Sequence, residues 1–481
     1  MNIVLYNQQD YYCAINSESN FLSEQNGICM EITPSGNEQT NTLTLELKGK
    51  NWNILWPNRE GEIFRASQVI ETINKYNITN GLTLSYPSTA SCRTIICTET
   101  SGQGIALLAA PDPKGKVTEF CINAEDHQHV SIKILGKNSK WCCINFNNMK
   151  DLKRKISKLM KFPEWPNLAA RLNESKWQVQ VGLIGPDGKT EIPENKGFDV
   201  LIDISELMLR ELGENNILHI FGYSRGHDSG YPDYTPSTLL GGKQGLKNAI
   251  NSIHSNRQKV VFYLNGRIAQ KENVEKDKLY NSVLSNSEGQ AFTEIYADRE
   301  FYVMNPSSIE WQDRLFSEAM ALKELGADGV QLDQLGGRAA PVNPGESWGE
   351  GYIKLIKRIR KENLTVWIQG LSDIYPADWF ELTHRKTNIL KDGTIRGGTP
   401  LGTADKRVFQ ISVPDQVLLI PLSKLEDFND MKNRKIIIDL DIGREELFLY
   451  TPSYMMQLKK LMNQAVISLG NDAESRVAVA L

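Results

Sequence analysis

The stretch 326-GADGVQLDQLGG-337 joins a short apolar segment to an aspartate and a glycine pair. Val330 and Leu332 alternate with Gln331 and Asp333, a period of two that is typical of a strand with opposite faces. Gln331 and Asp333 therefore share one face, and Asp333 lies at the carboxyl end of the strand. A carboxylate buried there costs free energy unless it is paired or has a function.

The residues before this strand read as a helix. Apolar side chains recur at helical spacing over residues 307–325. Ser307 and Glu310 fit a capping box at the start, and Gly326 fits a C-cap at the end. The sequence thus predicts a helix that runs directly into the strand.

Similar strand-like segments recur from about residue 169 onward, and helix-like patterns separate most of them. These segments are WQVQVGLI (177–184), ILHIFGY (217–223), KVVFYLNG (259–266), TVWIQG (365–370), RVFQIS (407–412) and KIIIDLD (435–441). Alternation of strands and helices indicates parallel strands with crossover helices. About 300 residues with seven or eight units match a (β/α)8 TIM-type barrel, which we predict over residues 169–481. A doubly wound sheet is less favoured because no GxGxxG follows the first strand.

The N-terminal part has a different pattern. Short alternating or β-branched runs are separated by turn-rich pieces; examples are TLTLELKG (42–49), GLTLSYP (81–87), GIALLAA (104–110) and VSIKILG (130–136). Regular short strands with turn signals predict a β-sandwich over residues 1–147. DLKRKISKLMKF then reads as an amphipathic helix, so residues 148–168 are expected to be a linker helix and turn.

Composition narrows the partners and the compartment. The net charge of −4 implies no broad basic surface, which argues against nucleic acid or an anionic membrane as partner. No apolar run is long enough to span a bilayer, and the N-terminus lacks a secretory pattern, so we expect a cytoplasmic protein. Seven cysteines, all within the first 143 residues, predict reduced thiols. No metal and no cofactor is expected, and the oligomeric state is left open.

Polar residues end several of the predicted barrel strands. The site of such a barrel is built from the carboxyl ends of the strands and the loops that follow them. Gln410 and Ser412 would end the predicted sixth strand. The other candidates for binding substrate, on strand ends and loops, are Tyr223, Arg225, His227, Asp228, Asp233, Tyr263, Asn265, Arg338, Trp348 and Gln369. Carboxylates, tyrosines and tryptophans gathered at a barrel mouth suit a carbohydrate substrate.

A resemblance strengthens this interpretation. The order YPDYTPS, FYLNGR, NPSSIEW, GADGVQLDQLGG and then GLSDIY resembles a bacterial family of glycosidase-like barrels, over roughly residues 215–420. The motif around Asp333 is similar to that of retaining glycoside hydrolases of the α-glucosidase and α-galactosidase type, many of which carry a β-sandwich before the barrel. The resemblance implies that Asp333, on the fourth strand, is the nucleophile.

The general acid is less well defined by this resemblance. Asp373 is the best match, with Asp415 after the predicted sixth strand as the reserve, although the usual position of the acid is on the sixth strand. Gln369 stands where some barrel glycosidases have a glutamate, and an amide cannot act as acid or base.

Each candidate also has a structural interpretation. Asp333 and Asp373 could be helix caps or turn residues, and Asp228 and Asp233 could be turn residues in a Gly/Pro-rich loop. Three functions therefore stay open: a glycoside hydrolase, a non-catalytic carbohydrate-binding protein on the same barrel, and an unrelated lyase or aldolase. The last ranks lowest because no lysine ends a predicted strand.

Overall fold

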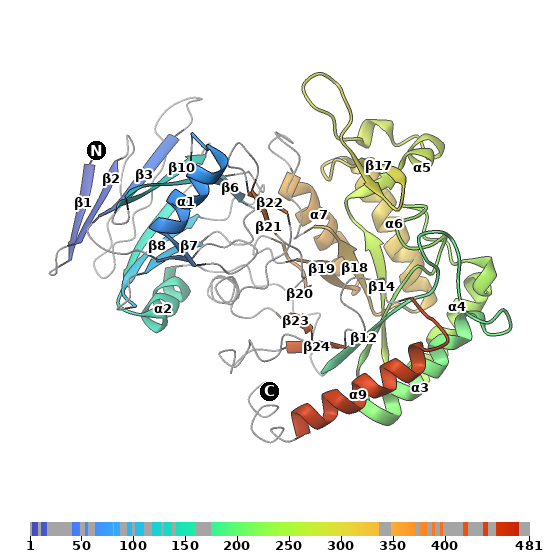
Figure 1. The fold of residues 1–481 in the computed structure, drawn as a ribbon. Helices are drawn as coiled ribbons and strands as arrows, with labels where there is room; N and C mark the ends of the chain where they lie inside the picture. Colours follow the sequence, from blue (N-terminus) through green and yellow to red (C-terminus); the bar gives the residue numbers. More distant parts are fainter. Residues whose placement is uncertain are drawn as a thin grey trace.

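The computed structural model has antiparallel sheets in its N-terminal part and a parallel barrel in its C-terminal part (Figure 1). It describes residues 175–335, 348–370 and 449–470 without a break, and elsewhere separate segments, mainly the strands and helices whose bounds follow. The chain is therefore mixed α/β, as the sequence predicts.

The described strands of the N-terminal part form two antiparallel sheets. The first has six strands in the order β1 (Asn2–Asn7), β2 (Tyr11–Asn16), β3 (Asn41–Lys48), β10 (His129–Gly136), β9 (Thr118–Asp126) and β6 (Leu82–Tyr86). The second has five, in the order β11 (Trp141–Phe146), β8 (Gly104–Ala109), β7 (Thr94–Thr98), β4 (Asn53–Leu55) and β5 (Ile63–Arg65). The predicted antiparallel β structure is present, while the sandwich itself stays a prediction.

In the described segments of this part, two helices accompany the sheets. Helix α2 (Met149–Leu159) follows β11, where the sequence predicts an amphipathic helix. Helix α1 (Ala66–Tyr76) interrupts a region that the sequence predicts to be β throughout. Its buried Val69 shows that one face packs against the core, and this single apolar face was overlooked among the strand patterns.

Eight parallel strands close into a TIM-like barrel. Their order is β12 (Trp177–Gly182), β13 (Ile217–Phe221), β14 (Lys259–Asn265), β18 (Gly329–Asp333), β19 (Thr365–Gln369), β20 (Trp379–Glu381), β23 (Val417–Pro421) and β24 (Ile436–Leu440). Pairing of β24 with β12 closes the ring. Since every strand has two neighbours, no edge is left unpaired.

The sixth strand differs from the sequence prediction. We expected residues 407–412, which lie outside the described residues, as do Gln410, Ser412 and Asp415. The structure instead has the three-residue β20 as the sixth strand and β23 as the seventh. A strand of three residues, Trp379–Glu381, is too short to show a detectable period of two.

Helices cover the outside of the barrel, namely α3 (Val200–Leu212), α4 (Gly242–Ser255), α6 (Ile309–Leu325), α7 (Trp348–Lys361) and α9 (Tyr454–Gly470). The N-cap of α6 is Ser308, whose hydroxyl accepts from the amide of Trp311, so the predicted Ser307 is wrong by one residue. Gly326 is the C-cap with φ 112°, as predicted. An insertion between β14 and α6 holds β15 (Ile268–Gln270), α5 (Lys271–Lys276), β16 (Thr293–Tyr296) and β17 (Arg299–Val303).

The barrel interior changes from apolar to polar along the strands. Five residues from five strands form a buried cluster separate from the main core: Ile217, Val261, Trp367, Trp379 and Ile437. Two residues further along β13, β14 and β24, the same face carries polar side chains. These are His219, Tyr263 and Asp439, and all three are buried. The alternation therefore builds an apolar floor beneath a polar upper layer.

Candidate active site

Asp333 lies at the carboxyl end of β18, inside the barrel. The register pairs it with Asn265 at the end of β14, and only 5% of Asp333 is exposed. Both residues end their strands at the face where barrels of this kind build their sites. The structure thus brings together two of the residues that the sequence singled out.

Each oxygen of the Asp333 carboxylate accepts one hydrogen bond. The hydroxyl of Tyr263 donates to Oδ2 at 2.7 Å, and the backbone amide of Gln334 donates to Oδ1 at 2.8 Å. Gln334 has φ 67°, a left-handed conformation that is unfavourable for a residue with a side chain. Strained backbone held by its surroundings is common beside functional groups, and here it brings an amide to the carboxylate.

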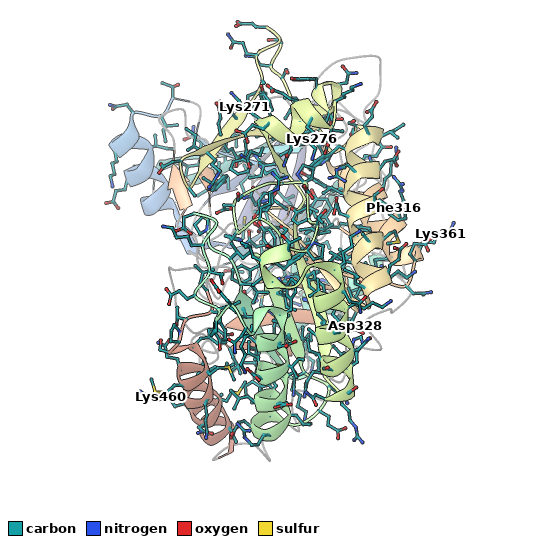
Figure 2. All side chains as sticks on the ribbon, turned by 90° about the vertical axis from the view of Figure 1, so that its right-hand side faces the viewer. Lys271, Lys276, Phe316, Asp328, Lys361 and Lys460 are labelled. Atoms are coloured by element: carbon teal, nitrogen blue, oxygen red, sulfur yellow. The ribbon has the colours of Figure 1, made fainter. Side chains whose placement is uncertain are left out.

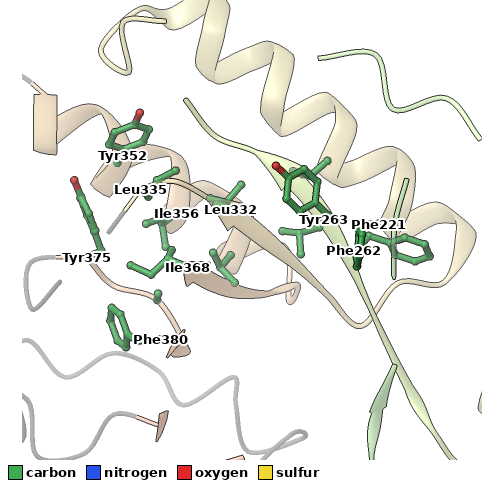
Figure 3. Packing of buried hydrophobic residues seen from close by; sticks show 14 of the residues in the cluster. Phe221, Phe262, Tyr263, Leu332, Leu335, Tyr352, Ile356, Ile368, Tyr375 and Phe380 are labelled. Atoms are coloured by element: carbon green, nitrogen blue, oxygen red, sulfur yellow. The ribbon is translucent and has the colours of Figure 1, made fainter. Parts of the chain in front are cut away.

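Asn265 supports Tyr263 from the same strand. Its amide Nδ2 donates to the Tyr263 hydroxyl at 3.1 Å, while its Oδ1 accepts from the backbone amides of Arg267 and Ile268 at 2.9 and 3.0 Å. The side chain is fully buried and cannot turn without breaking these bonds. Burial, followed by the charge of Asp333, raises the pKa of Tyr263 well above its usual value. Tyr263, which is labelled in Figure 3 among the buried residues, therefore keeps its proton and remains a donor.

The loop after β13 places aromatic rings against this group. The imidazole of His227 lies 5.1 Å from the ring of Tyr263 and 5.1 Å from that of Phe221, centroid to centroid. Tyr223 is buried, and its hydroxyl donates to the backbone oxygen of Tyr263 at 3.1 Å. This hydrogen bond supports β14. His227 and Tyr263 are thus in contact, whereas Tyr223 lies one layer outside them.

The charged residues of the same loop pair with their neighbours. Arg225 Nη2 lies 3.2 Å from Asp233 Oδ2, and Asp233 Oδ1 accepts from the amide of Thr235. The second contact is that of a turn residue, the alternative interpretation of Asp233. Asp228 has φ 50°, and its amide donates to the hydroxyl of Tyr231. Arg225 retains a largely exposed side chain, so it stays accessible from solvent.

His219 was not among the site residues predicted from the sequence. It is buried in β13, two residues before Phe221, and its ring meets that of Trp367 at 4.5 Å. Burial, and then the nearby His227, lowers the pKa of His219 to about 3, so it is neutral at ordinary pH. The sequence signal that could have identified His219 is a histidine inside an otherwise apolar strand.

A second carboxylate was missed at the end of β20. The register pairs Asn265 of β14 with Asp333 of β18, and Gln369 of β19 with Glu381 of β20. Leu332 pairs with Ile368, so the next residues along these two strands, Asp333 and Gln369, are also level. The last residues of four adjacent strands therefore form one row: Asn265, Asp333, Gln369 and Glu381. Trp379 begins this strand and is fully buried.

Three predicted site residues escape full description. Asp373 and Arg338 lie outside the described residues, and Trp348 begins α7 with a side chain that is not described. Tyr375 is described and buried against Tyr352 of α7, at 5.9 Å between centroids. Within the described residues, no cluster of three or more His, Cys, Asp or Glu side chains could hold a metal ion. None of the helices described is apolar over a stretch that would cross a bilayer.

Comparisons with known proteins agree with this architecture. A family model described as a domain of unknown function (DUF6259) matches residues 173–367. No curated protein matches the sequence. The α-N-acetylgalactosaminidase NagBb from Bifidobacterium bifidum superposes with a TM-score of 0.57 at 11% identity, covering 96% of this chain and 84% of that one.

Two further solved structures are similar. The α-galactosidase TtGalA from Thermus thermophilus has a TM-score of 0.57 at 13% identity, covering 97% of this chain and 89% of that chain. A GH31 family sulfoquinovosidase from E. rectale has a TM-score of 0.58 at 9% identity, covering 100% and 75%. Likeness at such low identity shows the fold alone. The structural neighbours of this chain are glycoside hydrolases, and its barrel has their fold.

Proposed function

We propose that this protein is a glycoside hydrolase that acts on a carbohydrate with retention of configuration, with Asp333 as its nucleophile. One observation carries the proposal: a buried carboxylate at the end of the fourth barrel strand, held by two donors in a polar layer. The barrel of the proposed enzyme spans residues 169–481. Residues 1–147 form an accessory β-sandwich, and residues 148–168 join the two domains.

The proposed reaction has two displacement steps. In the first, an oxygen of Asp333 bonds to the anomeric carbon, the glycosidic bond breaks, and the leaving oxygen takes a proton from a second carboxylic acid. In the second, that group accepts a proton from water while the water oxygen displaces Asp333. Each oxygen of Asp333 accepts a single hydrogen bond from the described residues, which leaves lone pairs for the attack.

Two residues compete for the role of the acid. The resemblance implies Asp373, which follows β19. The register supports Glu381, which ends the sixth strand two strands from Asp333 in the same row. Neighbouring strands are about 4.8 Å apart, so roughly 10 Å separates the two backbones. Two carboxylate side chains that extended toward each other from this backbone spacing would reach the about 5–5.5 Å that retaining enzymes use.

A comparison of Asp373→Asn with Glu381→Gln separates the two candidates. Loss of the acid slows substrates with poor leaving groups by roughly 10²–10⁴-fold, because an activated phenol departs without protonation. The variant of the true acid should therefore retain kcat/KM, which reports the first step, on dinitrophenyl glycosides and lose it on alkyl glycosides. If both variants behave like wild type on both substrates, neither residue is the acid.

A carbohydrate-binding protein without activity is the second candidate. Gln369, an amide in the row of strand ends, favours it, because an amide can bind hydroxyls but cannot transfer protons. The two candidates differ in turnover, whereas both predict that sugars bind at Asp333.

The decisive experiment is hydrolysis of a panel of α- and β-aryl glycosides by wild type and Asp333→Asn. The substitution keeps the shape and removes the nucleophilic charge, so activity should fall by roughly 10⁴-fold or more. Asp313→Asn is the matched control, since Asp313 is an exposed aspartate on α6. Full activity in Asp333→Asn would disprove the site. Sugar binding without turnover in wild type would favour the binding protein.

A further inference from the structure

Among the described residues, the hydroxyl of Tyr263 is the only side-chain group that donates a hydrogen bond to Asp333, at 2.7 Å. We propose that Tyr263 is a positioning residue that stabilises Asp333 as the leaving group when the glycosyl–enzyme intermediate breaks down. This inference rests on the proposed function, because it assigns a role within the second displacement. It predicts that the two chemical steps respond differently to loss of one hydroxyl.

The charge on Asp333 changes during the cycle. When the first bond to the anomeric carbon forms, the carboxylate becomes an ester and loses its negative charge. When water attacks, the ester C–O bond breaks and its electron pair returns to the Asp333 oxygen, while the water proton passes to the base. A hydrogen bond to an ionised acceptor is roughly twice as strong as one to a neutral acceptor. The bond from Tyr263 therefore weakens in the intermediate and strengthens as Asp333 departs.

The consequence for the two barriers is asymmetric. In the first step the donor stabilises the carboxylate of the free enzyme at least as well as the transition state, so it gives no acceleration. In the second step it stabilises the transition state more than the ester. Removal of the donor should slow only the second step, and the intermediate should accumulate.

The surroundings of Tyr263 fix the direction of its proton. Asn265 Nδ2 donates to the phenolic oxygen at 3.1 Å, so the Tyr263 proton is left to point at Asp333. Asn265 cannot reverse its amide, because two backbone amides donate to its Oδ1. The 5% exposure of Tyr263 excludes bulk water from this bond. A buried donor with a fixed direction needs no reorganisation when the charge returns.

The test is pre-steady-state kinetics of Tyr263→Phe with a dinitrophenyl glycoside that wild type hydrolyses. We expect kcat to fall roughly tenfold, KM to fall in parallel, and a burst of about one phenolate per active site to appear. Tyr454→Phe is the control: it removes an equally buried hydroxyl, which donates to the backbone oxygen of Gln180 on β12, two strands away from β14. A fall in kcat/KM equal to that in kcat, without a burst, overturns the inference.

Asn265→Asp provides a second variant in which Tyr263 is unchanged. It replaces the amide donor by an acceptor that competes with Asp333 for the Tyr263 proton, so the same parallel fall in kcat and KM is expected. If neither variant shows a parallel fall in kcat and KM, the inference is wrong. Failure of the proposed function is recognised separately, because wild type would then lack turnover or Asp333→Asn would keep it.

Discussion

Two aspartates at the two ends of β18 have different surroundings. Asp328 precedes the strand and is part of the scaffold: its Oδ2 accepts from the amide of Val260 at 2.8 Å and lies 3.0 Å from His254 Nε2. In Figure 2 Asp328 lies well below Lys271 and Lys276 of α5, which follows the carboxyl end of β14. Asp333 ends the strand among polar side chains. Position along a barrel strand, more than residue type, separates stability from function.

The contact between His254 and Asp328 predicts a pH dependence of stability. The hydrogen bond to Asp328 raises the pKa of His254 above 6.5 in the folded protein. A raised pKa means that the folded state holds the proton more tightly, so the stabilisation is complete below the unfolded pKa and is lost as the pH rises through the folded pKa.

We therefore expect His254→Gln to lower the free energy of unfolding at pH 5 by up to about 1 kcal/mol, since the pair is partly exposed, and by less at pH 9. Urea unfolding of both proteins at the two pH values measures the difference. An equal cost at both pH values would show that only the packing of His254 matters.

A buried ion pair joins three elements around the fifth and sixth strands. Arg360 of α7 donates to both oxygens of Asp378, at 3.1 and 2.8 Å, and the amide of Val366 in β19 donates to Asp378 Oδ2 at 2.8 Å. Asp378 directly precedes β20. The pair thus fixes where the short sixth strand begins, and Leu332, Ile356 and Ile368 fill the space between α7 and the sheet (Figure 3).

Asp378→Asn should be strongly destabilising. It leaves the charge of Arg360 buried without its partner, which costs about 3–5 kcal/mol. Glu350→Gln is the matched control, because Glu350 pairs with the exposed Lys354 on the same helix and should cost under about 1 kcal/mol. Chemical denaturation compares the two variants, and equal effects would contradict a structural role of the buried pair.

At the scale of the whole molecule, the C-terminal elements complete the barrel. β24 pairs with both β23 and β12, and α9 packs on α3 while the hydroxyl of Tyr454 donates to Gln180 of β12 at 2.5 Å. The last barrel strand and the last helix therefore bind the first strand and the first barrel helix. Such contacts, far apart in sequence, make the barrel one cooperative unit.

A shortened buried side chain on α9 tests whether this helix supports the closed barrel. Leu458 is fully buried, so Leu458→Ala should lower the free energy of unfolding by about 2–5 kcal/mol. Met456→Ala, at a position that is 70% exposed on the same helix, should change it by no more than about 0.5 kcal/mol. Tryptophan fluorescence in urea follows the barrel, since Trp367 and Trp379 lie inside it. Similar midpoints for the two variants would mean that α9 does not support the closed barrel.

Local patterns in the sequence were sufficient for most elements. Six barrel strands and the helices between them carry periods of two or 3.6, and Gly326 marks a helix end because only glycine adopts its φ easily. The alternation of Gln331 and Asp333 was enough to place Asp333 at the mouth of the barrel. The three-residue β20, the helix α1 and the strand β23 were not predicted. A very short strand and a lone helix among strands give weak periodic signals, and β23 is a short apolar run without alternation.

The tertiary structure alone decided which residues meet. Tyr263 and Asp333 are 70 positions apart, and no pattern within either strand indicates that the hydroxyl of one reaches the carboxylate of the other. The row that ends in Glu381 likewise depends on the register of four strands, which long-range pairing fixes. Sequence determines faces and ends because these are properties of one strand. Distances within a site are properties of several strands, and only the closed barrel sets them.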